Sequence, residues 1–289
     1  MGRAVLFIMT NLAVIAIMSV ILSLFGANRF LNEQGLNLGS LLIFSIIIGF
    51  TGSFFSLLIS KPMAKWTTGA KVIQQPENSF EHWLLKTVKI LSQRANIKTP
   101  EIAVYNGQPN AFATGAFKDD ALVAVSTGLI QNMSKEEIEG VLGHEIAHIA
   151  NGDMITMTLL QGVLNTFVVF LSRLVGYIVD RFLSRGGSSS SGVGYFVSVI
   201  TCQIIFGLVA SIIIAWFSRY REFRADFGST QLLGSKKPMV NALTKLAQMQ
   251  SSELPESVAT LGINKPSGIL QLFSTHPPIE QRIMALQNN

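Results

Sequence analysis

The stretch VLGHEIAHIANGDMITMTLL, residues 141–160, joins a pair of histidines to a long apolar run. His144 and His148 are four residues apart with Glu145 directly after the first. On a helix this spacing places both imidazoles on one face, where they can bind a single metal ion. Zinc bound in this way acidifies water and polarises a carbonyl group, and Glu145 is placed to accept a proton. Two ordinary surface histidines beside a glutamate would give the same five letters, so the pattern needs support elsewhere in the chain.

The apolar run belongs to a membrane-protein composition. Of the 289 residues 49% are hydrophobic and 13% are charged, whereas about a quarter are charged in ordinary soluble domains. Four segments have the length of about 20 residues that a helix needs to cross a bilayer: Val5–Phe25, Leu36–Ile59, Met154–Val179 and Tyr195–Phe217. The last two contain polar residues, so a buried hairpin in a soluble core is the alternative for them. We predict an integral membrane protein with four transmembrane helices.

Basic residues flank these segments unevenly, which predicts their orientation. One side of the membrane would hold Arg3, Lys61, Lys65, Lys71, Arg219, Arg221 and Arg224. The other side would hold Arg29, Arg181 and Arg185. Because basic flanks tend to remain in the cytoplasm, we expect both termini and both long polar segments there. The flanking residues also account for much of the net charge of +5, so no nucleic-acid partner is needed to explain it.

The segments divide the chain into four parts. Residues 1–60 form an N-terminal transmembrane hairpin, and residues 61–153 the first part of a cytoplasmic catalytic domain. Residues 154–217 form a second transmembrane hairpin with a flexible Gly/Ser-rich outer loop at 181–194. Residues 218–289 are the second part of the catalytic domain. Because an even number of crossings separates the two polar parts, they can fold together on one side.

Local patterns predict the secondary structure of the first polar part. Apolar residues at helical spacing predict a helix over Glu81–Ala95. Short runs at Glu101–Tyr105, Ala111–Ala116 and Ala121–Ser126 predict strands. Ser134-Lys135-Glu136-Glu137 has the spacing of a capping box, which begins the helix that carries the histidine pair. The predicted fold is mainly α, of the α+β class, with a small β-sheet in a zincin-like domain.

A catalytic zinc site needs a third protein ligand and keeps one position open for water. Glu222 is the best candidate, because it follows the fourth span and returns to the same side of the membrane as His148. Asp226 lies four positions further along the same predicted helix, where its carboxylate could fix the tautomer of a ligand histidine. The alternative is that both acids form surface ion pairs with the neighbouring arginines.

These residues, together with several other motifs in the same order, resemble the HtpX-type bacterial membrane metalloproteases, which are related to the CAAX prenyl proteases. The resemblance covers nearly the whole chain. Its motifs are Thr10–Val14, Asn110–Gly115, Val123–Leu129, His144–Asp153, Phe217–Arg219, Glu222 with Asp226, and Thr275–Pro278.

The resemblance implies a zinc endopeptidase of the bacterial inner membrane whose active site faces the cytoplasm. One Zn2+ per chain would be bound by His144, His148 and Glu222, with Glu145 as the general base and Asp226 as the carboxylate behind a ligand. The implied role is stress-linked quality control of misfolded or damaged membrane proteins. Polypeptides and the lipid bilayer are the expected partners, and self-cleavage and homo-oligomerisation stay open.

Two further sites have equally matched alternatives. Asn110, Ala111, Phe112 and Ala113 look like the edge strand on which related peptidases bind an extended substrate, or they form a plain hairpin. His276 and Arg282 fall where related proteases bring a histidine and an arginine close to zinc, where they could stabilise an oxyanion. Otherwise this segment is a helix start with two prolines.

Two other classes of function are alternatives to proteolysis. A non-catalytic membrane scaffold with a structural zinc would need a closed site of four ligands, yet no cysteine lies near the histidines and Glu145 would have no task. A transporter could use Gln161, Asn165 and Arg173 as a polar path, but four spans are few and the polar domain would be idle. The sequence therefore favours a zinc-dependent membrane endopeptidase.

Overall fold

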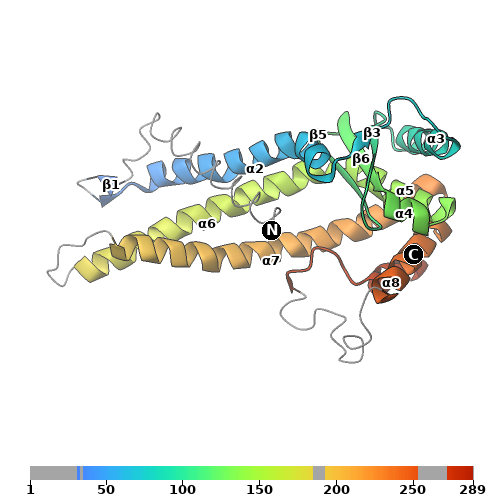
Figure 1. Ribbon diagram of the computed structural model, residues 1–289. Helices are drawn as coiled ribbons and strands as arrows, with labels where there is room; N and C mark the ends of the chain where they lie inside the picture. Colours follow the sequence, from blue (N-terminus) through green and yellow to red (C-terminus); the bar gives the residue numbers. More distant parts are fainter. Residues whose placement is uncertain (1–30, 33–34, 185–192, 253–271, 289) are drawn as a thin grey trace. The chain divides into compact units, whose positions relative to one another are not determined.

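The computed structural model describes residues 31–32, 35–184, 193–252 and 272–288 (Figure 1). The chain divides into two compact units, residues 1–55 with 158–211 and residues 56–157 with 212–289. Three long helices contribute to both units: α2 (Leu38–Thr68), α6 (Asp153–Ser184) and α7 (Val193–Leu233). The first unit also contains a short hairpin of β1 (Leu31–Asn32) and β2 (Gly35–Leu36).

Helices α2, α6 and α7 are long and apolar enough to cross a membrane. They correspond to the second, third and fourth predicted spans, whereas the first, Val5–Phe25, lies outside the described residues. Large apolar side chains on all three helices are exposed, including Ile43, Phe167 and Ile204. A soluble protein would bury surfaces of this size, so they are suited to face lipid.

Small residues let α2 and α6 approach each other closely in the first unit. A Cβ atom at Gly49 would lie 2.4 Å from Thr166 Oγ1, and one at Gly162 would lie 2.6 Å from the ring of Phe50. Asn165 Nδ2 lies 3.5 Å from Ser53 Oγ in the same region. This is the packing expected between membrane helices. In lipid the hydrophobic effect does not hold helices together, so they associate through close packing of small residues and hydrogen bonds between polar ones.

The helices continue beyond the apolar runs that predicted them. Helix α6 extends to Ser184 and α7 begins at Val193, so the prediction of a flexible loop over residues 181–194 is wrong at both ends; residues 185–192 are outside the described part. Hydropathy identifies the segment that can lie in lipid, whereas a helix can extend beyond that segment as long as its backbone hydrogen bonds continue.

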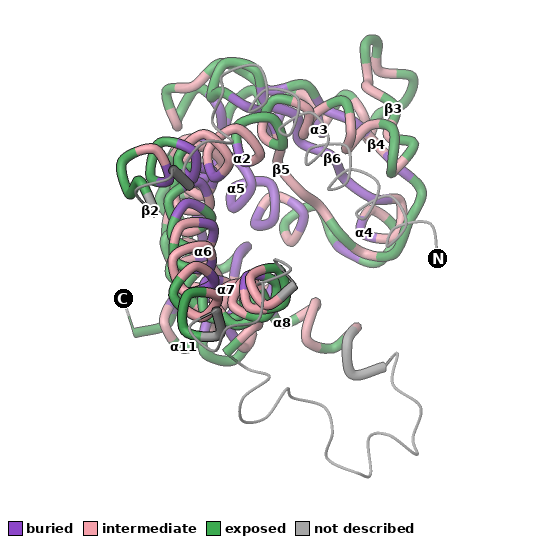
Figure 2. Tube along the Cα trace, turned by 90° about the vertical axis from the view of Figure 1, so that its left-hand side faces the viewer, coloured by how far each residue is buried: buried purple, intermediate pink, exposed green. Residues whose placement is uncertain are grey.

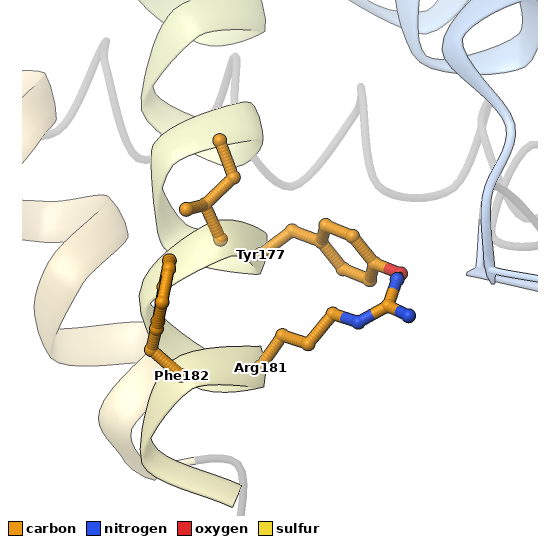
Figure 3. Close-up of a pocket in the computed structure, with 4 residues that line it drawn as sticks. Tyr177, Arg181 and Phe182 are labelled. Carbon is orange, nitrogen blue, oxygen red and sulfur yellow. The ribbon is translucent and has the colours of Figure 1, made fainter. Parts of the chain in front are cut away.

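Near the end of α6, Tyr177, Ile178, Arg181 and Phe182 line a surface hollow (Figure 3). Its mixture of aromatic rings and a cation is typical of a membrane–water interface.

The second unit contains a mixed sheet with the strand order β3-β4-β6-β5. Its strands are β3 (Lys71–Val72), β4 (Glu101–Tyr105), β5 (Ala111–Phe117) and β6 (Asp120–Ser126). The sequence predicted β4, β5 and β6 but not β3, which is too short to show alternation. Strand β4 is parallel to β6, and β5 is antiparallel to β6 at the edge of the sheet.

Helix α5 (Lys135–Asn151) is the central element of this unit and is largely buried (Figure 2). Around it lie α3 (Ser79–Arg94), α4 (Thr127–Asn132), α8 (Lys237–Ser252) and α11 (Ile279–Asn288). The capping box of Ser134 and Glu137 is confirmed at its start. Its Leu142 and Ile146 share a core with Leu84, Ile102 and Val123 of neighbouring elements. The mainly α fold with a small sheet and membrane helices is as predicted.

Candidate metal centre

Helix α5 carries the histidine pair on one buried face. His144 is 7% exposed and His148 is 8% exposed, and their Nε2 atoms lie 3.1 Å apart. The helix ends at Gly152, which has a left-handed φ of 67°, and α6 begins at the next residue. A residue other than glycine rarely adopts this backbone conformation at low cost. One glycine therefore separates the helix of the two histidines from a helix that continues towards the membrane.

Helix α7 supplies the third candidate ligand. The carboxylate of Glu222 is 2% exposed, and its oxygens lie 3.5 Å from His144 Nε2 and 3.4 Å from His148 Nε2. Ligand atoms of these three residues all lie within 4.8 Å of one another. The structure thus brings together three residues from two helices that are far apart in the sequence.

Both histidines face a carboxylate with their other ring nitrogen. His144 Nδ1 lies 2.9 Å from Asp226 Oδ1, and His148 Nδ1 lies 2.6 Å from Asp153 Oδ2. An ionised carboxylate only accepts hydrogen bonds, so each Nδ1 carries the proton and each Nε2 is left with a bare lone pair. Two lone pairs and a carboxylate directed at one point repel each other unless a cation lies between them.

The spacing of the donor atoms matches the need of a tetrahedral metal ion. Ligand bonds of about 2.0–2.1 Å at tetrahedral angles place donor atoms about 3.3 Å apart. The three distances here are 3.1, 3.4 and 3.5 Å. The residues present therefore fit a bound metal such as zinc with a fourth position left for water.

The carboxylates of the centre also favour a positive charge between the ligands. Burial lowers the pKa of His144, but its hydrogen bonds to Asp226 and Glu222 outweigh burial and raise the pKa to about 9. In the metal-free protein a proton thus takes the place that a cation would occupy. Metal binding at neutral pH must displace this proton.

The remaining predicted residues lie around the same centre. Glu145 is 9% exposed, and no hydrogen bond or ion pair of its carboxylate occurs within the described part of the chain. His276 Nδ1 lies 2.9 Å from Glu222 Oε2, with its imidazole largely exposed. Arg282 donates from Nε and Nη2 to the two oxygens of Asp226, at 2.7 and 2.5 Å, and its Nη1 lies 3.6 Å from Glu222. The guanidinium of Arg282 is therefore engaged with Asp226, behind the ligands.

Asn110, Ala111, Phe112 and Ala113 lie at the start of the edge strand. Ala111, Phe112 and Ala113 pair with Val125, Ala124 and Val123 of β6, and the backbone of Asn110 exchanges hydrogen bonds with Ser126. No strand occupies the other side of β5 in the described sheet. Strand β5 also contacts α5, the helix that carries the histidine pair.

One contact of the centre was not predicted from the sequence. Asp153 is fully buried and binds His148 Nδ1, while Arg221 and Arg224 pair with Asp153. The available signal was an acidic residue five positions after His148, directly after the helix-ending glycine. That signal is indistinguishable from an ordinary acidic residue in the first turn of a helix.

Comparison with known proteins agrees with this geometry. The sequence profile of peptidase family M48 matches residues 78–289. The chain is 63% identical over 288 residues to a protease HtpX homolog of Janthinobacterium sp. (strain Marseille), covering 100% of this chain and 99% of the relative. It is 60% identical over 291 residues to the protease HtpX homolog of Herminiimonas arsenicoxydans, with the same coverage of each chain.

A solved structure, that of S. mikatae Ste24p, has the same fold. Its TM-score is 0.67 at 19% identity, and the match covers 98% of this chain and 66% of that chain. The chain described here thus spans about two thirds of the length of Ste24p. With a buried metal-binding set from two helices, three helices able to span a membrane and relatives matched over its whole length, the chain belongs to peptidase family M48 and is a membrane metalloprotease of the HtpX type.

Proposed function

We propose that the protein is a zinc-dependent endopeptidase that hydrolyses misfolded or damaged membrane proteins at the cytoplasmic face of the bacterial inner membrane, in stress-linked quality control. The observation that carries this proposal is the convergence of His144, His148 and Glu222 with donor distances of 3.1–3.5 Å. These ligands lie on or next to helices that continue into membrane spans.

The residues around the centre have distinct tasks in this reaction. Zinc bound by the three ligands would acidify a water molecule and polarise the substrate carbonyl. Glu145 follows His144 on α5 and accepts the proton of the attacking water, then donates it to the leaving amine. His276, which is exposed beside Glu222, donates a hydrogen bond to the oxyanion. Arg282 acts through Asp226, which holds the imidazole of His144 in place.

The free side of β5 is the proposed substrate-binding edge. Asn110, Ala111, Phe112 and Ala113 would pair with an extended polypeptide through backbone hydrogen bonds, which bind without demanding a particular sequence. Such binding suits an enzyme that acts on unfolded chains of many sequences.

The continuity of α7 supports action near the membrane surface. Trp216 is 62% exposed and Tyr220 is 59% exposed, and exposed aromatic residues where the apolar part of a helix ends are typical of the lipid–water interface. Glu222 follows Trp216 by six residues on the same helix, a rise of about 9 Å. The peptide bond to be cleaved would therefore lie within about two helical turns of that interface.

The test is cleavage of an unfolded membrane protein by the purified full chain in detergent. We expect cleavage that is lost with a chelator and restored by zinc. Glu145→Gln should bind zinc with little change and lose cleavage by at least about a hundredfold, the usual contribution of a general base. Glu139→Gln, on the same helix, is the matched control and should retain cleavage. Full hydrolysis by Glu145→Gln would overturn the mechanism.

The alternative of a structural zinc in a non-catalytic scaffold required a fourth protein ligand. Among the described residues, the group that can hold a metal consists of His144, His148 and Glu222. Three ligands with an open position are the arrangement of a catalytic zinc site. The donor set thus favours the endopeptidase.

A further inference from the structure

Asp153 is a buried carboxylate in the second unit that the mechanism above does not use. It is the first residue of α6 and is 0% exposed. Its Oδ2 lies 2.6 Å from His148 Nδ1, and its Oδ1 accepts a hydrogen bond from Arg224 Nη2. Burial of an ionised carboxylate is costly unless charge and hydrogen bonds compensate for it. The side chain is therefore held at this position by specific partners.

Two arginines of α7 compensate the charge of Asp153. Arg224 binds Oδ1, and Arg221 Nη1 lies 3.5 Å from Oδ2. Arg221 Nη1 also lies 3.2 Å from His148 Nδ1, but a guanidinium only donates hydrogen bonds. The proton on Nδ1 is thus directed at Asp153, and Arg221 is an ion-pair partner of the carboxylate.

The arrangement repeats the one behind the other histidine. His144 Nδ1 faces Asp226, which is bound by Arg282; His148 Nδ1 faces Asp153, which is bound by Arg224. Each histidine is followed by a carboxylate and then a guanidinium. The two chains of contacts come from different helices. Asp226 and Arg282 lie on α7 and α11, whereas Asp153 and Arg224 lie on α6 and α7, both of which continue as candidate membrane spans.

We propose that Asp153 is a positioning residue that fixes the tautomer and orientation of His148 for metal binding, and that Arg224 and Arg221 hold Asp153 in place. This inference rests on the proposed zinc site. The orientation of His148 then depends on the contact between the start of α6 and the part of α7 that carries Arg221 and Arg224. Partners behind metal ligands typically contribute 10–100-fold in metal affinity.

Asp153→Asn is the most informative substitution. The arginines can only donate, so they would retain the amide oxygen of Asn and turn its NH2 group towards His148. Nδ1 would then have to accept, the proton would move to Nε2, and the nitrogen that binds the metal would be blocked. We expect zinc affinity, measured by chelator competition on the full chain in detergent, to fall about 10–100-fold.

A second substitution separates positioning from a role in starting α6. Asp153 is the first residue of α6 after Gly152, where its charge interacts only weakly with the helix dipole; Asp153→Ser removes the carboxylate and loses little of this contribution. We expect Asp153→Ser to lower zinc affinity as Asp153→Asn does; the thermal midpoint of the metal-free protein falls as well, because Arg221 and Arg224 lose their buried anionic partner. The d–d absorption of the cobalt-substituted protein should change in both variants, because it reports the geometry of the ligands.

Asp119→Asn, in an exposed turn of the same unit, is the matched control and should bind zinc as the wild type does. The proposal is overturned if both Asp153 variants bind zinc with wild-type affinity and an unchanged cobalt spectrum. A lower metal-free midpoint with wild-type zinc affinity in both variants also overturns it, since the carboxylate would then be structural only. Neither readout needs turnover, so a failure of the proteolysis assay is distinguishable from a failure of this inference.

Discussion

Replacing Gly143 by alanine is expected to weaken both metal binding and the fold. Gly143 lies on α5 directly before His144 and faces Ser229 of α7. A Cβ atom there would lie 2.5 Å from Ser229 Oγ and 3.3 Å from its Cα and Cβ atoms. Ordinary contacts between heavy atoms begin at about 3.5 Å, so the hydroxyl lies about 1 Å too close. The two helices that carry the metal ligands must separate or the hydroxyl must move.

The cost can be worked out from these contacts. Ser229 Oγ donates to Gly140 O at 2.8 Å, and loss of this hydrogen bond costs about 1 kcal/mol. Overpacking adds about 1–3 kcal/mol, while alanine in place of glycine within a helix returns about 1 kcal/mol. We therefore expect the free energy of unfolding of the metal-free protein to fall by about 1–3 kcal/mol. Zinc tolerates errors of only about 0.2 Å in its ligand distances, so its affinity should fall at least about tenfold.

Chelator competition gives the zinc affinity, and thermal unfolding of the metal-free protein gives the stability. Gly207→Ala is the control, because a Cβ atom at this position of α7 meets nothing within 4 Å; it should retain the wild-type zinc affinity. Ser229→Ala combined with Gly143→Ala removes the closest clash and should restore most of the affinity. Wild-type zinc affinity in Gly143→Ala alone, or a double variant no better than the single one, would refute the reasoning.

Three further outcomes follow from the site and its charges. Glu222→Gln should lower zinc affinity at least about tenfold, measured by metal content after dialysis, because it removes the negative ligand. The pKa of His144 is raised to about 9 from the ordinary 6.5. Because zinc must displace this proton, zinc affinity should rise by up to about tenfold per pH unit from pH 7 and level off above pH 9. The stability that the protonated histidine contributes to the metal-free protein should be complete below pH 6.5 and lost as pH rises through 9. The hydrogen bond from Lys65 lowers the pKa of Glu101 below its ordinary 4.5. The ionised Glu101 therefore stabilises the fold above pH 4.5, and this stabilisation is lost as pH falls below that value. Glu101→Gln should abolish this part of the acid sensitivity of the thermal midpoint, and an unchanged acid profile would argue against the ion pair.

Much of this protein could be predicted from local sequence, because the responsible interactions are local. The capping box of Ser134 and Glu137 and the four-residue spacing of His144 and His148 act within one helix. The short strand-like runs within residues 101–126 predicted three strands of the sheet. The length of the apolar runs predicted the three spans that lie within the described residues.

Only the tertiary structure decided which charged groups meet. Asp153 has the appearance of an ordinary acidic helix start, yet it binds His148. Arg282 is expected near the metal; it lies 3.6 Å from Glu222 and also binds Asp226, a contact that the sequence does not reveal. The partner of a buried charge is set by which helices the fold brings together, here across 71 residues between Asp153 and Arg224 and 56 between Asp226 and Arg282. Periodicity reports which face of a helix is buried but not what lies opposite that face. The ligands are therefore evident from the sequence as candidates, whereas the carboxylates and arginines that orient them depend on long-range packing, because the cost of burying their charges is met only when the helices meet.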